Sequence, residues 1–304
     1  MSVKKYIVMG VILTLLTILL IGCSNKDQLN STANIKEEAI PYTHPEAMIS
    51  ADQLKKILGQ PNLTILDTRT RDVYEQSHIP GAICYDFRSV LDPNRRGRFN
   101  SPKAFSLRIR EYGVNSSDHI VLYSDNYNHA ALWFFLNMYG LNVQILNGGF
   151  GQWQAKGYEI ETGRVRRGNL GSFSLSDEQQ KANFIIETID VANALQQPEN
   201  VVIIDARSDE EYGGRGHIPG AINIPWDQLI NEDMTFKNAS DLKKVFLDKE
   251  VTPEKQVIIY SNNVFRASFI YFALNKLLGY TNVKLYDGFY LYWYRHRPLA
   301  TGST

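Results

Sequence analysis

The sequence predicts an α/β protein built from two tandem copies of one domain, each a mostly parallel β-sheet flanked by helices. An internal repeat supports this: LTILDTRTRDVYEQSHIPGAI at 63–83 recurs as VVIIDARSDEEYGGRGHIPGAI at 201–222. The shared hexapeptide begins at His78 and again at His217, an offset of 217 minus 78, or 139 residues. Each copy also alternates short apolar runs with helical stretches, a pattern typical of a parallel sheet covered by helices.

The elements of the second copy follow from this alternation. The expected strands are Val201–Asp205, Val257–Tyr260 and Val283–Tyr286, with a helix at 267–278 between the last two. The first copy matches them, because IVLYSDNYNHAALWFFLNMYG parallels VIIYSNNVFRASFIYFALNKLLGY, and VQILNGGF parallels VKLYDGF. Gly140 and Gly279 stand where a left-handed residue is expected to end each of these helices.

Composition limits the classes of function. The 304 residues have the length expected of two domains. Lysine plus arginine and aspartate plus glutamate both number 32, so no overall charge favours a nucleic acid partner. The only two cysteines, Cys23 and Cys84, are too few for a disulfide framework or a cysteine-rich zinc site. We expect no metal and no cofactor.

The first residues have the pattern of a secretory signal. Lys4 and Lys5 precede an apolar run at 6–21, which ends at Gly22 and Cys23 before an abrupt change to polar residues. This end resembles the lipobox of bacterial lipoproteins, in which the cysteine is lipidated. Acyl chains on Cys23 would hold the protein at the extracytoplasmic face of the cell membrane. A plain signal anchor is the alternative, since the run is nearly long enough to span a membrane.

These patterns divide the chain into five segments. A signal peptide is expected at 1–22, a polar tether at 23–45, a first domain at 46–161, a linker at 162–182 and a second domain at 183–302. The tether has no pattern that could form a core. The linker has no sustained periodicity.

Three motifs that recur in order in both copies carry a resemblance to a known family. These are the D-x-R segment followed by GHIPGAINIP, the strand, loop and helix of VIIYSNNVFRAS, and the strand end LYDGF. Together they resemble a tandem rhodanese, the family of thiosulfate and 3-mercaptopyruvate sulfurtransferases, over about 46–302. The resemblance implies a degenerate first copy and an active site in the second. In that site a cysteine opens the loop, becomes a persulfide, and passes its sulfur to cyanide or another thiophile.

This sequence departs from the family at the reactive position. The place of the cysteine falls on Ser261 and that of the closing arginine on Arg266, while the first copy has Ser124 and His129 there. Sulfur transfer depends on a thiolate, whose pKa of about 8.5 falls near a helix N-terminus and cations. An alcohol stays protonated in the same field. Ordinary rhodanese chemistry is therefore expected to be absent.

Ser261 is also poorly placed to act as a nucleophile itself. A serine needs a neighbouring base to accept its proton, and the loop SNNVFR offers asparagine amides and a guanidinium. In the first copy, His129 stands at the opposite end of the loop from Ser124. Serine hydrolase chemistry is thus the weaker interpretation.

Anion binding is the property that the loop is expected to keep. Four residues separate Ser261 from Arg266, so the loop N–H groups can converge on one centre at the start of a helix expected at 266–278. The phosphatases of related fold have one more residue between cysteine and arginine, which argues against that activity. Arg266 either clamps the anion or lies over the helix. The expected binding residues are Arg207, Ser261, Asn262, Asn263, Val264, Phe265 and Arg266.

The remaining repeated residues suit structural roles better. Asp205 is expected to cap a turn, whereas Arg207 reaches an anionic substrate or pairs across that turn. His78 and His217 lie in apolar surroundings typical of hydrogen-bonded structural histidines. Cys84 is the one thiol outside the lipidation motif, and we expect it to be buried and inert.

Two functions of different class remain. The first is a membrane-tethered pseudoenzyme that binds a small anion, a sulfur compound or a protein partner without turning it over. The aromatic segment YDGFYLYWYRHRP at 286–298 could dock such a protein, or could instead close the domain core. The second is an active thiosulfate or 3-mercaptopyruvate sulfurtransferase that uses Cys84 or another non-standard route.

Overall fold

A computed structural model describes residues 40–95, 97–164, 169–176 and 184–302. The expected signal peptide, Cys23 and most of the expected tether lie outside these residues. In the described part of the chain, no helix is both long and apolar enough to cross a membrane.

Each half of the chain contains one five-stranded sheet, and every strand pair in both sheets is parallel. The order β1-β5-β4-β2-β3 of the first sheet matches the order β6-β10-β9-β7-β8 of the second. The strands of the first sheet are β1 Met48–Ile49, β2 Leu63–Asp67, β3 Ile83–Cys84, β4 His119–Tyr123 and β5 Val143–Leu146. Those of the second sheet are β6 Ile185–Ile186, β7 Val201–Asp205, β8 Ile222–Asn223, β9 Gln256–Tyr260 and β10 Val283–Tyr286. The predicted α/β fold class is confirmed.

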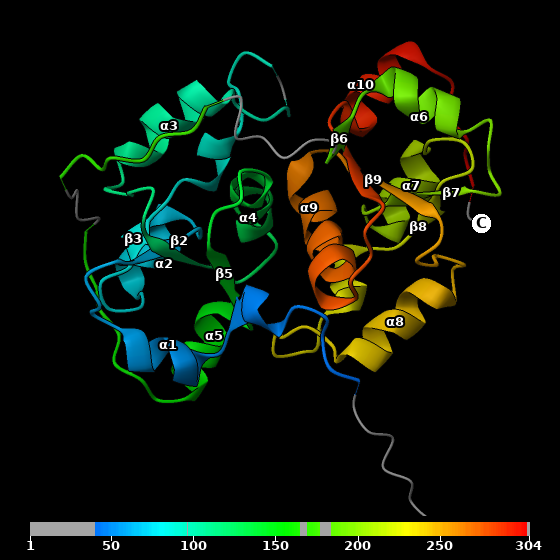
Figure 1. Cartoon of the computed structure of the whole chain (residues 1–304). Helices are drawn as coiled ribbons and strands as arrows, with labels where there is room; N and C mark the ends of the chain where they lie inside the picture. The colour runs from blue at the N-terminus through cyan, green and yellow to red at the C-terminus, as the bar shows by residue number, and fades with distance from the viewer. Residues whose placement is uncertain (1–39, 96, 165–168, 177–183, 303–304) are drawn as a thin grey trace, which may run out of the picture. The chain divides into compact units, whose positions relative to one another are not determined.

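Helices accompany both sheets (Figure 1). Those of the first half are α1 Ala51–Ile57, α2 Arg71–Gln76, α3 Pro102–Arg110, α4 His129–Met138 and α5 Gly149–Ala155. Those of the second half are α6 Thr188–Ala194, α7 Asp209–Arg215, α8 Ala239–Leu247, α9 Val264–Phe272 and α10 Phe289–His296. Short 3-10 turns occur at Pro45–Ala47, Phe87–Val90 and Trp226–Leu229.

One predicted helix starts at a different residue. The loop of the second copy, which opens at Ser261, is called the second loop. We expected the helix after it to begin at Arg266, but α9 begins at Val264 and passes into a π-helical turn at Ala273–Leu277. The reason is a cap: the Asn263 side chain accepts a hydrogen bond from the N–H of Phe265 and starts the helix early. The predicted left-handed glycines are confirmed, because Gly140 and Gly279 both have φ of 75°.

The two halves share a continuous core. Helices α4 and α9 pack against each other (Figure 1). The Trp133 and Phe272 rings meet edge to face at 4.6 Å, and those of Phe134 and Tyr271 at 4.7 Å. Such pairs add to the free energy gained by burying their apolar area. One cluster of buried side chains therefore contains residues of both halves, including those of α4 and α9.

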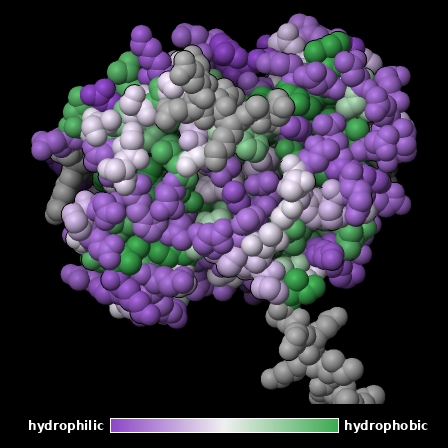
Figure 2. Space-filling model, viewed as in Figure 1, coloured by the Kyte–Doolittle hydropathy of each residue, from purple (hydrophilic) through white to green (hydrophobic). Residues whose placement is uncertain are grey.

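The described part of the expected linker packs onto the first half, where Phe173 and Leu175 are buried and belong to this core. The aromatic segment at 286–298 contains both buried and exposed rings: Trp293 is buried, whereas Tyr292 and Tyr294 are exposed. On the face shown in Figure 2, hydrophilic residues are spread widely and hydrophobic residues show in separate patches between them.

We predict that the shared core makes the two halves unfold together. Replacing Phe272, which is fully buried, by alanine should lower the free energy of unfolding by about 3–5 kcal/mol. Urea unfolding should still show one transition. The control Leu107→Ala, at a side chain that is 56% exposed, should change stability by less than about 0.5 kcal/mol. Two separate transitions, or equal effects of the two variants, would contradict the shared core.

Candidate functional site

The second loop lies at the carboxyl edge of the second sheet, where the ends of parallel strands bring side chains together. Strand β9 ends at Tyr260, and α9 begins at Val264, so only Ser261, Asn262 and Asn263 lie between them. Val264 and Phe265 belong to the first helical turn and are buried. The loop is therefore shorter than the sequence predicted, and the Phe265 N–H is already bound to the Asn263 side chain at 3.2 Å.

The Ser261 hydroxyl is held inside this loop. Ser261 is fully buried, and its Oγ donates a hydrogen bond to the backbone carbonyl of Asn263. Among the hydrogen bonds of the described residues, Ser261 Oγ has no other partner. A nucleophilic serine needs a base that accepts its proton, and a carbonyl oxygen cannot serve as one. The partner of the hydroxyl is thus a carbonyl and not a base, and its lack of reactivity stays a prediction.

Arg266 forms an ion pair with Glu211, a carboxylate that no sequence motif indicated as part of the site. Its Nη1 lies 2.5 Å from Glu211 Oε2, and the Asn262 amide donates to Glu211 Oε1, also at 2.5 Å. Glu211 belongs to the first turn of α7, where it forms a capping box with Ser208. The capping sequence S-x-x-E indicated a helix start but not that this start faces the loop. The Arg266 guanidinium therefore binds Glu211. Whether it also clamps a bound anion stays a prediction.

The charge on Glu211 is stabilised by these contacts. Partial burial raises its pKa, but the hydrogen bond and charge of Arg266 outweigh burial. The Ser208 N–H and the Asn262 amide add to this effect, so that the pKa falls to about 2. Glu211 is thus an internal anion bound beside the loop at neutral pH.

Arg207 is fully buried beneath the same edge. Its Nη2 lies 2.6 Å from Asp205 Oδ2 and 2.7 Å from the Gly216 carbonyl, and the guanidinium stacks 3.7 Å from the centre of the Tyr290 ring. Its Nη1 has no hydrogen-bond partner among the described residues. These contacts support the structural alternative for the pair, while a role of Arg207 in binding substrate stays a prediction.

The first copy has an equivalent buried Asp–Arg pair, and a side chain of its own loop binds the loop serine. Arg69 pairs with Asp67 at 2.7 Å, and its Nη1 lies 3.4 Å from Asp125. Inside that loop, the Ser124 hydroxyl donates to Asn126 Oδ1 at 3.1 Å. His129 is buried, and burial lowers its pKa to about 4, so that the ring stays neutral. The first loop therefore offers no free centre for an anion.

A cavity of about 640 Å³ opens beside the second loop. Asn263 and Phe265 line it from the second domain, and Arg88 and Arg108 line it from the first. Neither arginine forms an ion pair in the part of the chain that the structure describes. No sequence pattern indicated that these residues line one cavity, because the arginines come from a different domain than the loop.

The two carboxylates that line this cavity each accept a hydrogen bond from a backbone N–H. Asp86 accepts the backbone N–H of Arg88 at 3.1 Å, and Asp92 accepts that of Asn94 at 2.8 Å. A hydrogen bond to the charged form stabilises a carboxylate. The guanidinium groups, by contrast, keep their donors for a ligand. The cavity can therefore bind a small anion through charge-assisted hydrogen bonds.

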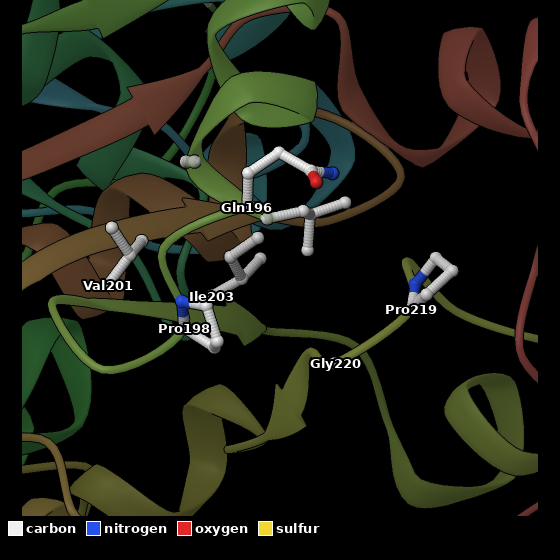
Figure 3. Close-up of a pocket in the computed structure, with 8 residues that line it drawn as sticks. Gln196, Pro198, Val201, Ile203, Pro219 and Gly220 are labelled. Atoms are coloured by element: carbon white, nitrogen blue, oxygen red, sulfur yellow. The ribbon is translucent and has the colours of Figure 1, made fainter.

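A second cavity, of about 400 Å³, has different chemistry. Figure 3 shows it with Val201 and Ile203 of β7, Pro198 before that strand, and the Pro219–Gly220 turn. Gln196 supplies the one side-chain amide in its lining, and no charged residue lines it. This apolar cavity has no groups that could catalyse a reaction or bind an anion.

Cys84 is the one free cysteine among the described residues, and it lies outside the second loop. It ends β3 of the first sheet, is buried, and is a free cysteine. Burial, with the nearby charge of Asp67, raises the pKa of its thiol to about 11. A thiol with such a pKa is almost wholly protonated at neutral pH and reacts slowly. The expected burial of Cys84 is confirmed, and its inertness stays a prediction.

Metal binding has no candidate in the described ranges. Within residues 40–95, 97–164, 169–176 and 184–302, no group of three or more His, Cys, Asp or Glu side chains could hold an ion.

Comparison with known proteins identifies relatives along most of the chain. The profile of the rhodanese-like domain matches residues 50–156 and again 188–296. The sulfur carrier protein TtuD of Thermus thermophilus is 31% identical over 83% of this chain and 95% of its own. A thiosulfate sulfurtransferase of Corynebacterium glutamicum is 30% identical over 86% of this chain and 93% of its own.

Solved structures give the same result for the fold. The 3-mercaptopyruvate sulfotransferase SseA from Escherichia coli superposes with a TM-score of 0.72 at 29% identity, covering 80% of this chain and 98% of SseA. An anaerobic ergothioneine biosynthesis enzyme from Chlorobium limicola superposes with a TM-score of 0.73 at 23% identity. It covers 85% of this chain and 71% of that enzyme, and at this identity the likeness concerns the fold alone.

We predict that Glu211 stabilises the loop in a pH-dependent way. Its folded pKa is lowered, so the stabilisation is present above the ordinary glutamate pKa and is lost as the pH falls toward about 2. Glu211→Gln should lower the free energy of unfolding by about 2 kcal/mol at neutral pH, and by progressively less below about pH 4. The matched control Glu210→Gln, on the exposed side of the same turn, should cost less than about 0.5 kcal/mol. An effect of Glu211→Gln that is independent of pH would contradict this explanation.

Proposed function

The chain belongs to the rhodanese-like domain family, and from this premise we propose that it is a catalytically impaired sulfurtransferase homologue that binds a small anion or sulfur compound. One observation supports the impaired chemistry above all others. The residue that opens the second loop is Ser261, and its buried hydroxyl is hydrogen-bonded to the Asn263 carbonyl. The loop has neither a thiolate nor an activated oxygen.

The chemistry explains why oxygen cannot take the place of sulfur. In a thiosulfate reaction, a thiolate attacks the outer sulfur, the sulfur–sulfur bond of thiosulfate breaks, and sulfite leaves. Cyanide then takes the bound sulfur and restores the thiolate. A serine hydroxyl stays protonated at neutral pH without a base, and an oxygen–sulfur bond gives no comparable persulfide. Ser261 therefore cannot carry the sulfur atom between the two steps.

Ligand binding is proposed for the cavity next to the loop. Arg88 and Arg108, which are both exposed, line this cavity together with Asn263. Within the loop itself, Glu211 already binds Arg266, so an added anion would meet a neutralised cation there. We infer that a small oxyanion or an anionic sulfur compound binds between the two arginines and contacts the loop through Asn263.

Attachment to the membrane is a further part of the proposal. The apolar run that ends at Gly22 and Cys23 supports lipidation of Cys23 after removal of residues 1–22. Acyl chains would then hold the two domains at the extracytoplasmic face of the membrane, at the end of a polar tether. In that position the protein would bind its ligand or a protein partner outside the cytoplasm.

The second candidate is an active sulfurtransferase that works by a non-standard route. The relatives favour it, because the Corynebacterium glutamicum protein carries the name thiosulfate sulfurtransferase. The thiol that such a route requires would be Cys84, whose burial and raised pKa argue against it. A direct assay separates the two candidates.

We predict that the wild-type chain forms no thiocyanate from thiosulfate and cyanide above the enzyme-free rate. Ser261→Cys restores the missing sulfur, and after incubation with thiosulfate its intact mass should increase by one sulfur atom. Thiocyanate formation by the wild type would overturn the proposal. If the cysteine variant gains no sulfur, then the loop geometry has been lost as well as the thiol.

We also predict that Arg88 and Arg108 bind the anion. Titration calorimetry with thiosulfate should show heat of binding to the wild type, and Arg88→Ala or Arg108→Ala should each weaken the affinity by about tenfold. Lys103→Ala removes a positive charge from the same helix as Arg108 without changing the cavity lining. This control should change the affinity by less than about twofold. Equal losses in all three variants would indicate a non-specific charge effect and contradict the site.

A further inference from the structure

The two copies of the repeat differ in the element that supplies a carboxylate to the loop. In the first copy, Asp125 of the loop itself lies 3.4 Å from Arg69 Nη1. The second copy has Asn262 at the position of Asp125. Its carboxylate comes instead from helix α7, as Glu211, which accepts a hydrogen bond from the Asn262 amide. Each loop therefore has a carboxylate beside it, but from a different part of the domain.

Glu211 occurs together with the cation that it binds. When DTRTRDVY is aligned with DARSDEEY, Val73 of α2 takes the position of Glu211. When the two loops are aligned, His129 takes the position of Arg266. The copy with an arginine at the end of the loop thus has a glutamate on the preceding helix, and the copy with a histidine has a valine. The glutamate and the arginine form a pair that only the second copy can make.

Both members of this pair are largely removed from water. The Glu211 side chain is 19% exposed and that of Arg266 is 13% exposed. Arg266 Nη1 lies 2.5 Å from Glu211 Oε2, and Nη2 lies 3.3 Å from Oε1, so that two nitrogens of the guanidinium contact two oxygens of the carboxylate. Contacts of this bidentate kind are among the strongest between charged side chains. An anion from solution would have to displace Glu211 to reach these donors.

We propose that Glu211 sets the charge preference of the second loop, because its carboxylate takes the place of a bound anion at Arg266. Thiosulfate and other oxyanions are thereby excluded from the loop itself. A sulfur compound that enters the loop has to be uncharged. The proposal concerns the loop alone and does not depend on whether the cavity between Arg88 and Arg108 binds an anion.

The exclusion has an electrostatic cause. The ion pair of Glu211 and Arg266 has no net charge, and an added anion would lie beside a carboxylate of like charge. Without that carboxylate, the partly buried guanidinium would have no counter-ion, which is costly in free energy. An anion from solution would reduce that cost by taking the position of Glu211. Removal of the Glu211 charge is therefore expected to create an anion site at Arg266.

Titration calorimetry with thiosulfate tests the proposal in a chain that lacks the cavity site. The background carries Arg88→Ala and Arg108→Ala, so that the cavity no longer contributes to binding. In this background, Glu211→Gln should raise the affinity for thiosulfate by at least about tenfold. Addition of Arg266→Gln should abolish that gain. The matched control Glu210→Gln removes the same charge from the exposed neighbouring position and should change the affinity by less than about twofold.

Two results would overturn the proposal: no gain of affinity in a folded Glu211→Gln chain, or a gain that persists when Arg266 is replaced as well. A purely structural ion pair would lose stability in Glu211→Gln without gaining an anion site.

If the Glu211→Gln chain does not fold, the background with Glu211 intact gives a second test. The NMR signal of the Arg266 Nε–H should stay in place when thiosulfate is added, and a saturable shift would contradict the exclusion. Failure of the wild type to bind thiosulfate would count against the proposed function and leave these outcomes unchanged.

Discussion

A buried ion pair at the carboxyl end of a central strand holds the rest of the site in place. Arg207 joins Asp205 at the end of β7 to the carbonyl of Gly216, and its guanidinium lies against the Tyr290 ring. The N–H of Tyr290 in turn donates to the Ser261 carbonyl at 3.0 Å. Removing one partner of such a pair leaves a buried charge and typically costs about 3–5 kcal/mol. The second loop thus depends on a charge pair that lies beneath it.

Above this ion pair, the polar side chains of the second loop are bound to other groups of the protein. The Ser261 hydroxyl binds a carbonyl, the Asn263 side chain caps α9, and Arg266 binds Glu211. In the first copy, the Asn126 side chain fills the equivalent loop. Both loops therefore have internal partners where a sulfur carrier would need free donors around a thiolate. Arg88 and Arg108, which form no ion pair among the described residues, line the cavity beside the second loop.

The repeat and its periodicity predicted both parallel sheets, because strand and helix patterns are local properties of the sequence. Strands β7 and β10 have the predicted bounds. The start of α9 was predicted wrongly at Arg266, although Asn263 carried a capping signal that marks the observed start at Val264. The contact of Glu211 with the loop joins residues far apart in the sequence, and so does the cavity that Asn263 and the two arginines line. No local pattern encodes such contacts, so only the structure could reveal them.

We infer that this scaffold has kept the rhodanese fold and lost the atom that carries sulfur. The most direct test is the intact mass of the wild-type chain held with excess thiosulfate, recorded before any sulfur acceptor is added. We expect a single species with the mass of the unmodified protein. A species heavier by one sulfur atom, removed again by cyanide, would show that the chain carries sulfur covalently and would contradict the account.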